Sequence, residues 1–97
     1  MIATEIKRNL CNWGEELQPR LFELDTPYRG HSFVVVVVCD LPGWGLDKTE
    51  VFAATAKGGA VAAANGGLEP LDTFGRDDEN TPLPSHTEAL SRIGYST

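Results

Sequence analysis

A run of apolar residues, Phe33 to Val38, lies near the middle of the chain, and all of it after Phe33 is valine. β-branched side chains lose χ1 freedom in a helix and pack well on a pleated sheet, so residues 31–39 predict a strand. Neighbouring side chains of a strand point to opposite faces, so an all-valine strand must be covered on both. We therefore expect this strand in the middle of a sheet with further structure on each face.

The residue pattern also predicts strands on both sides of the valine run. Residues 21–25 form one such strand before a Thr-Pro turn, and residues 48–55 form another after the Pro-Gly loop at 40–45. The Lys-Gly-Gly turn at 57–59 would close a hairpin onto a further strand at 60–64, which is rich in alanine. Connections as short as these predict an antiparallel meander.

The last third of the chain combines a long loop with a short helix. Residues 65–84 contain three of the six prolines and the acidic run at 77–79, which predicts a long acidic loop. Ser85 with a glutamate three residues later is the capping-box pattern, and Gly94 suits the left-handed position after a helix end. We expect a helix over 85–94 that docks on the sheet, because so short a helix is not stable alone.

The first 18 residues leave two alternatives open. Poor helix formers such as Asn9 and Gly14 favour a strand to about Asn12 with a turn at 13–15. Helical spacings of 4, 4, 3 and 4 instead separate the apolar residues Ile2, Ile6, Leu10, Trp13 and Leu17. The spacing carries slightly more weight, so we expect a helix in this segment.

Together these elements predict one α+β domain over residues 1–97. Its expected architecture is an antiparallel β-sheet of four to five strands with the C-terminal helix packed on one face. A chain of 97 residues has room for one modest hydrophobic core and no second domain.

Composition limits the classes of function. The chain has 14 Asp+Glu against 8 Lys+Arg, a formal net charge of −6. Binding to nucleic acid or to anionic membrane depends on Lys and Arg, so neither is expected. The central apolar run is far shorter than the roughly 20 residues of a membrane-spanning helix. The first residues do not form the basic and apolar regions of a secretory signal, so the cytoplasm is the expected compartment.

The residue patterns do not predict a catalytic, cofactor or metal site. His and Cys residues are not at zinc-ligand spacings, and the glycines near 58 and 66 match neither phosphate-binding motif. Cys11 and Cys39 would pair only in an oxidising compartment, so Cys39 is expected to be a buried free thiol. Cys39 with His86 is the remaining pair for a small enzyme, and it requires the C-terminal helix to begin against the end of the valine strand.

Surface recognition remains, and exposed aromatic rings beside acidic loops are its candidates. Trp44 lies in the loop Pro42-Gly43-Trp44-Gly45, where small residues present a large ring, and tryptophan is frequent at binding hot spots. Acids around Phe74 could steer a basic partner toward an aromatic anchor. The structural alternatives are rings that pack on the core and acids that solvate a loop. The candidate partner-binding residues are Trp44, Phe74, Asp77, Asp78, Glu79 and Tyr95.

Several segments between residues 20 and 96 also form a recognisable pattern. They are Leu21-Phe22-x-Leu24, Gly30-His31 before the valine strand, Thr49 to Ala54, Ser85 to Leu90, and Ile93-Gly94-Tyr95. With them the chain resembles a group of small uncharacterised proteins encoded by actinobacterial phages, mycobacteriophages among them. The first 18 residues and the Trp44 loop lie outside the pattern.

The resemblance implies a biological context and no catalytic residue. It implies a non-enzymatic phage accessory protein that binds a host protein in the host cytoplasm, where it modulates or inhibits host growth or excludes competing phages. The alternatives are a minor virion or assembly component and a small cysteine/histidine-dependent enzyme. Because a small sheet has open edge strands, a homodimer through a sheet edge also stays open.

Overall fold

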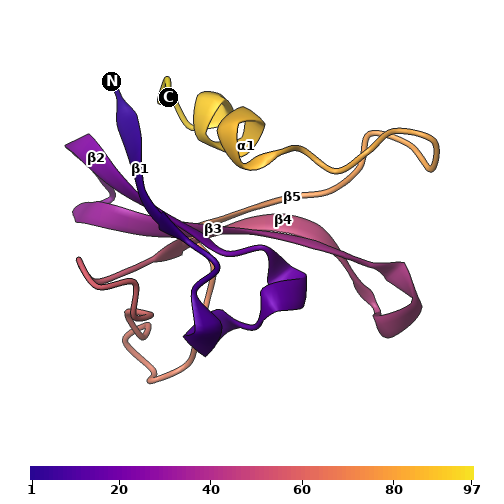
Figure 1. Ribbon diagram of the computed structural model, residues 1–97, viewed down its shortest axis with the longest axis horizontal. Helices are drawn as coiled ribbons and strands as arrows, with labels where there is room; N and C mark the ends of the chain where they lie inside the picture. Colours follow the sequence, from indigo (N-terminus) through magenta and orange to yellow (C-terminus); the bar gives the residue numbers. More distant parts are fainter.

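The computed structural model describes all 97 residues and contains a five-stranded antiparallel sheet in the order β1-β2-β3-β4-β5 (Figure 1). One α-helix lies against one face of this sheet, so the predicted α+β meander is confirmed. None of the helices has the length and apolar character needed to cross a lipid bilayer. The strands are β1 (Ala3–Arg8), β2 (Arg20–Tyr28), β3 (His31–Leu41), β4 (Leu46–Ala53) and β5 (Asp72–Phe74). The helices are α1 (His86–Arg92) and the short 3₁₀ helices η1 (Cys11–Trp13), η2 (Glu15–Leu17) and η3 (Pro42–Trp44).

Strand β3 is the middle strand of the sheet, as the valine run predicts. It pairs with β2 on one side and with β4 on the other, and every residue from Val34 to Cys39 is buried. Alternate valines serve different faces, because Val36 belongs to the core under α1 and Val35 to the core on the opposite face. The expectation that both faces are covered is therefore confirmed.

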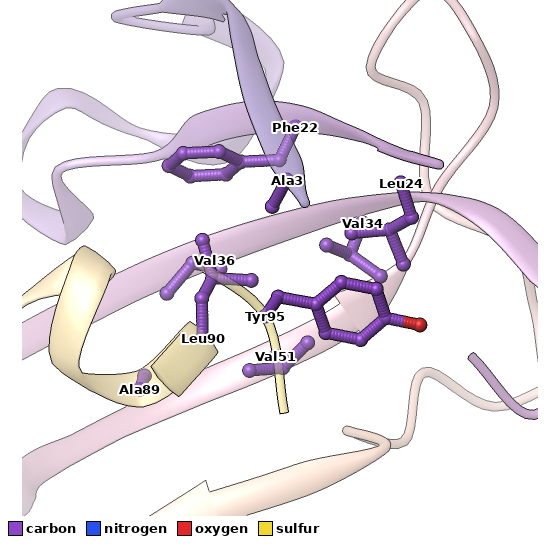
Figure 2. Packing of buried hydrophobic residues seen from close by; sticks show 9 residues of the cluster. All are labelled: Ala3, Phe22, Leu24, Val34, Val36, Val51, Ala89, Leu90 and Tyr95. Carbon is purple, nitrogen blue, oxygen red and sulfur yellow. The ribbon is translucent and has the colours of Figure 1, made fainter. Parts of the chain in front are cut away.

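The core under α1 joins the helix to four of the strands and the C-terminal tail (Figure 2). Ala89 and Leu90 of α1 are fully buried, and Phe22 of β2 is 1% exposed. Tyr28, Leu71, Phe74 and Ile93 pack around this group. Its buried members are Ala3, Phe22, Leu24, Val34, Val36, Val51, Ala89, Leu90 and Tyr95. We call this group the helix-face core.

The second core lies on the opposite face of the sheet, under the chain that contains η1 and η2. The ring of Trp13 tilts against Phe52 at a centroid distance of 5.2 Å, and its Nε1 donates a hydrogen bond to the Gly58 carbonyl over 2.7 Å. Gly58 has φ +88°, and a Cβ there would lie 3.1 Å from Leu10, so this position requires glycine. The buried members of this opposite-face core are Leu10, Leu21, Val35, Val37, Cys39, Phe52 and Ala54.

The N-terminal segment does not form the helix that its spacing favours, so that prediction is wrong. Strand β1 instead pairs with β2, and Ile2 and Ile6 of the supposed helical stripe are exposed. Positive φ values at Asn9 and Gly14 interrupt any helix that would run through these two positions, and only the single turn η1 lies between them. The alternative prediction of a strand in this segment is closer to the structure, although β1 ends at Arg8 and not near Asn12. Pairing with β2 satisfies backbone groups and outweighs the weak local helix propensity of this sequence.

The fifth strand comes from the segment that was expected to be a continuous loop. The turn at 55–59 forms, but residues 60–64 make only a single bridge, Ala54 to Ala60, so the predicted alanine strand is wrong. β5 takes the place beside β4 and interrupts the loop predicted over 65–84. Thr73 and Phe74 have a stronger strand preference than the alanines of residues 60–64. Phe74 also packs on the helix-face core, whereas an alanine side chain is too small to add much packing there.

Helix α1 lies within the predicted range 85–94, and its N-terminus is capped by Ser85, although only the Ser85 half of the capping box is formed. The Ser85 Oγ accepts a hydrogen bond from the backbone N–H of Glu88 over 3.2 Å, and Gly94 follows the helix with φ +99°. These contacts satisfy backbone groups that a helix end leaves without partners.

Removing this cap tests how much it contributes to stability. Ser85→Ala is expected to lower the free energy of unfolding by about 1 kcal/mol, within the range of roughly 0.5–2 kcal/mol for such caps. Ser91→Ala, at an exposed helical position of the same residue type, is the matched control and should change it by less than about 0.5 kcal/mol. Urea unfolding measures the free energy of unfolding of both variants. Equal losses would show that the Ser85 cap stabilises the protein no more than an ordinary exposed serine of the helix.

The free edges of the sheet carry features that discourage strand addition. The C-terminal tail covers the beginning of β1, where Ala3 N–H donates to the Ser96 carbonyl over 2.8 Å. Further along β1, the register shifts between Glu5 and Lys7, and this exposed stretch is charged. β5 at the other edge has only three residues. Bulges, charges and short strands all oppose edge pairing, so these edges offer little support for the predicted homodimer.

Candidate protein-binding site

Trp44 lies at the turn between β3 and β4, at the end of the longest hairpin of the sheet. Pro42 begins the single turn η3, and Gly45 ends it with φ +74° while its N–H donates to the Pro42 carbonyl over 3.0 Å. This turn holds the Trp44 side chain away from both cores, at 83% exposure. No other large apolar residue of the chain is as exposed.

A hollow of about 440 Å³ lies beside Trp44, between the hairpin end and η2. Leu41 and Leu46 are paired residues at the end of the β3–β4 ladder, and both are left partly uncovered. Leu17 of η2 packs against the opposite-face core and forms the facing wall. The lining residues are Glu16, Leu17, Leu41, Trp44 and Leu46, and we call this hollow the Trp44 pocket.

The Trp44 pocket is open because the opposite-face core ends before the hairpin does. Val35, Val37 and Cys39 are covered, whereas Leu41, the next residue on the same face, lies beyond the cover that η1 and η2 provide. Its volume falls within the ~300–1,000 Å³ of typical ligand pockets. An apolar hollow with one polar residue on its wall suits an aromatic or branched aliphatic side chain.

Arg76 connects the loop after β5 to the other face of the same hairpin end. Its guanidinium donates to Asp40 over 2.5 Å, to Asp47 over 2.8 Å and to the Thr81 carbonyl over 2.9 Å. The hydrogen bond to Asp47 raises the pKa of Arg76 above its usual value. These contacts fix the acidic run Asp77-Asp78-Glu79, which is exposed, close to the hairpin end.

Two of the aromatic candidates pack against the helix-face core. Tyr95 is 2% exposed, and its hydroxyl donates to the Thr26 carbonyl over 2.6 Å, so the prediction of a surface anchor there is wrong. Gly94 turns the chain after α1 and directs Tyr95 into the helix-face core. Phe74 is half-buried against the same core, with the Arg92 guanidinium 5.5 Å from its ring centre. Of the three predicted aromatic anchors, Trp44 alone is presented to solvent.

Cys39 and His86 do not come together. The Cys39 side chain belongs to the opposite-face core, whereas α1, which carries His86, packs on the helix-face core. Both cysteines are free and Cys39 is buried, as expected, and burial raises the pKa of its thiol. His86 contacts the Gln18 carbonyl through Nε2 over 2.5 Å. No group of three His, Cys, Asp or Glu side chains is placed to hold a metal ion.

The burial of His86 predicts a pH dependence of stability. Burial lowers the pKa of His86 below its usual 6.5, so the folded protein keeps the neutral ring at pH values where the unfolded chain already binds a proton. The contribution of the neutral, buried His86 to the free energy of unfolding is therefore fully present above pH 6.5. It is lost progressively as the pH drops through 6.5, because the unfolded chain then binds the proton. Urea unfolding across this range should show the fall in the native protein and a weaker one in His86→Gln. An identical pH slope in both proteins would contradict it.

A second hollow, of about 260 Å³, lies between the β2–β3 turn and the segment before β5. Its one arginine, Arg29, already donates to the Leu71 carbonyl over 2.7 Å and lies 3.8 Å from Asp72. No strongly exposed aromatic side chain lines this hollow. Its lining residues are Arg29, His31, Ala53, Val61, Ala62, Ala63, Glu69, Pro70 and Leu71.

The pattern of the sequence did not identify the other walls of the Trp44 pocket. Leu41 and Leu46 do flank the turn symmetrically, so the assumption of a tight hairpin could have paired them on one face. Glu16 and Leu17 had no such signal, because the N-terminal chain crosses the sheet and reaches the hairpin only in three dimensions.

No known protein family, curated protein or solved structure matches the chain.

Proposed function

We propose that this protein is a non-enzymatic binding module whose contact surface is the Trp44 pocket. The observation that carries the proposal is the 83% exposure of Trp44 beside an apolar hollow of about 440 Å³. Tryptophan is enriched among the few residues that dominate protein interfaces, and these residues gather around pockets from which binding excludes water. A ring and a hollow side by side offer a partner both an anchor and a receptor.

The Trp44 ring is large enough for its burial to supply a major part of the binding free energy. An aromatic side chain of this kind buries about 150–250 Å² in an interface. At ~25 cal/mol per Å² this corresponds to roughly 4–6 kcal/mol before the costs of association. A micromolar complex has a binding free energy of about −8 kcal/mol, so Trp44 would be its leading contact.

The biological setting of the proposal comes from the phage resemblance. We propose a phage accessory protein that binds a host protein in the host cytoplasm, and that this binding inhibits host growth or excludes competing phages. A single small domain with its exposed anchor at the end of a paired hairpin is suited to block or redirect a larger protein by occupying its surface.

Affinity capture from a mycobacterial lysate tests the proposal. The tagged protein should retain a defined host protein, and the Trp44→Ala variant should not. Leu68→Ala is the matched control, because Leu68 is 54% exposed and lies outside the Trp44 pocket. The captured protein is then purified and bound again in isolation, and growth is followed on expression of each variant. Equal capture by the native protein and Trp44→Ala, or no capture at all, would overturn the proposal.

A further inference from the structure

We infer that the segment of the partner that enters the Trp44 pocket is basic, with an aliphatic or aromatic anchor residue flanked by lysine or arginine. This inference rests on the proposed function and names the chemistry of the partner. Its basis is the distribution of charge over the molecule in relation to the pocket.

The net negative charge of the protein is concentrated at the hairpin end. Three segments meet there, namely residues 15–17, 40–48 and 76–81. They contain seven of the 14 acids and only two of the 8 bases, which leaves a net charge of −5. The rest of the chain has seven acids and six bases and is almost neutral, with a net charge of −1. The acids are Glu15, Glu16, Asp40, Asp47, Asp77, Asp78 and Glu79, and the bases are Lys48 and Arg76.

These acids lie on both faces of the hairpin end that carries the apolar hollow. Glu16 is part of its wall, on the face that η2 covers. Asp40 and Asp47 lie on the other face of the hairpin, where one guanidinium, that of Arg76, meets two carboxylates and leaves an excess of negative charge. The exposed run 77–79 follows directly. A partner that inserts an apolar side chain beside Trp44 thus enters a region of negative electrostatic potential, which attracts cations and repels anions.

Charge also argues against two other occupants of the Trp44 pocket. A second copy of this chain would bring two acidic hairpin ends together, and like charges at an interface cost free energy. The surface of an anionic lipid bilayer would be repelled by the same carboxylates. A basic peptide segment satisfies both parts of the surface, because its apolar residue fills the hollow and its flanking cations face the acids.

Selection from a display library of short random peptides tests the inference on the intact protein. Peptides whose binding is lost in Trp44→Ala should be enriched in Lys and Arg around a Leu, Phe or Trp. Trp44-dependent peptides without that basic enrichment would overturn the inference and leave the proposed function standing. A library with no Trp44-dependent peptides would also overturn it, and the lysate capture would then decide the proposed function separately. Trp44-dependent binding to phosphatidylglycerol vesicles would likewise contradict it.

Charge variants supply the second arm of the test. The double variant Glu15→Gln, Glu16→Gln should weaken binding of a selected peptide about 3- to 10-fold at low salt. The matched control is Glu23→Gln, Glu88→Gln, which removes two exposed acids away from the pocket and makes the same change in net charge. The control should bind as the native protein does, and added salt should weaken the native complex. Equal affinity of the two double variants would contradict a local electrostatic role.

Discussion

Phe22→Ala is expected to lower the free energy of unfolding by about 3–5 kcal/mol. The ring is 1% exposed and belongs to the helix-face core, so its removal leaves a cavity in this core (Figure 2). A domain of this size has a total stability of only about 5–15 kcal/mol, so the loss is a large part of it. Urea unfolding followed by circular dichroism gives the value, and Phe22→Leu supplies a milder step if the alanine variant does not fold.

Phe52→Ala on the other face is the companion measurement. Phe52 is 8% exposed and is covered by Trp13, so this variant also is expected to lose about 3 kcal/mol or more. Glu23→Ala at an exposed position of β2 is the control and should change the free energy of unfolding by less than about 0.5 kcal/mol. A loss near that of the control in Phe52→Ala would mean that the second face of the sheet is not a true core.

Trp44→Ala is expected to weaken the complex with the captured host protein by about 2–4 kcal/mol, which is roughly 30- to 1,000-fold in Kd. The same change should leave the free energy of unfolding within about 0.5 kcal/mol of the native value, because the ring packs in neither core. Calorimetric titration measures the first quantity, and urea unfolding the second.

Two further variants are the controls for the loss of binding in Trp44→Ala. Trp44→Phe keeps a flat apolar ring and should recover part of the affinity. Leu68→Ala removes another exposed apolar side chain, 54% exposed and outside the pocket, and should have no effect on binding. A large loss of stability in Trp44→Ala would instead show that the ring supports the fold, and the binding data could not then be assigned to a contact.

The parts of the fold that the sequence predicted are those in which local preference and long-range packing agree. Five consecutive valines can be satisfied only in a strand that is buried on both faces, and β3 has that position. Ser85 and Gly94 fix the ends of α1 through contacts within a few residues. In both cases the determining interactions lie close together in the chain or follow from one uniform stretch.

The errors arose where distant partners decide the structure. Residues 1–8 became a strand because β2 offers an edge, which no local spacing reveals. β5 replaced the alanine segment beside β4 because Phe74 also finds a place on the helix-face core. The same limit applies to the site, since the exposure of Trp44 and the burial of Tyr95 depend on how two similar glycine turns direct the chain.

The most direct test of the Trp44 pocket as the binding surface is the amide NMR spectrum of the protein, recorded during titration with its captured partner. If the Trp44 pocket is the binding surface, the shifts should concentrate on residues 15–17 and 41–46 and on the Trp44 indole N–H. The amides of β1 and of the hollow at residues 61–71 should remain unchanged. Shifts centred on β1 or on 61–71, with the hairpin end unaffected, would show that this protein meets its partner through a different surface.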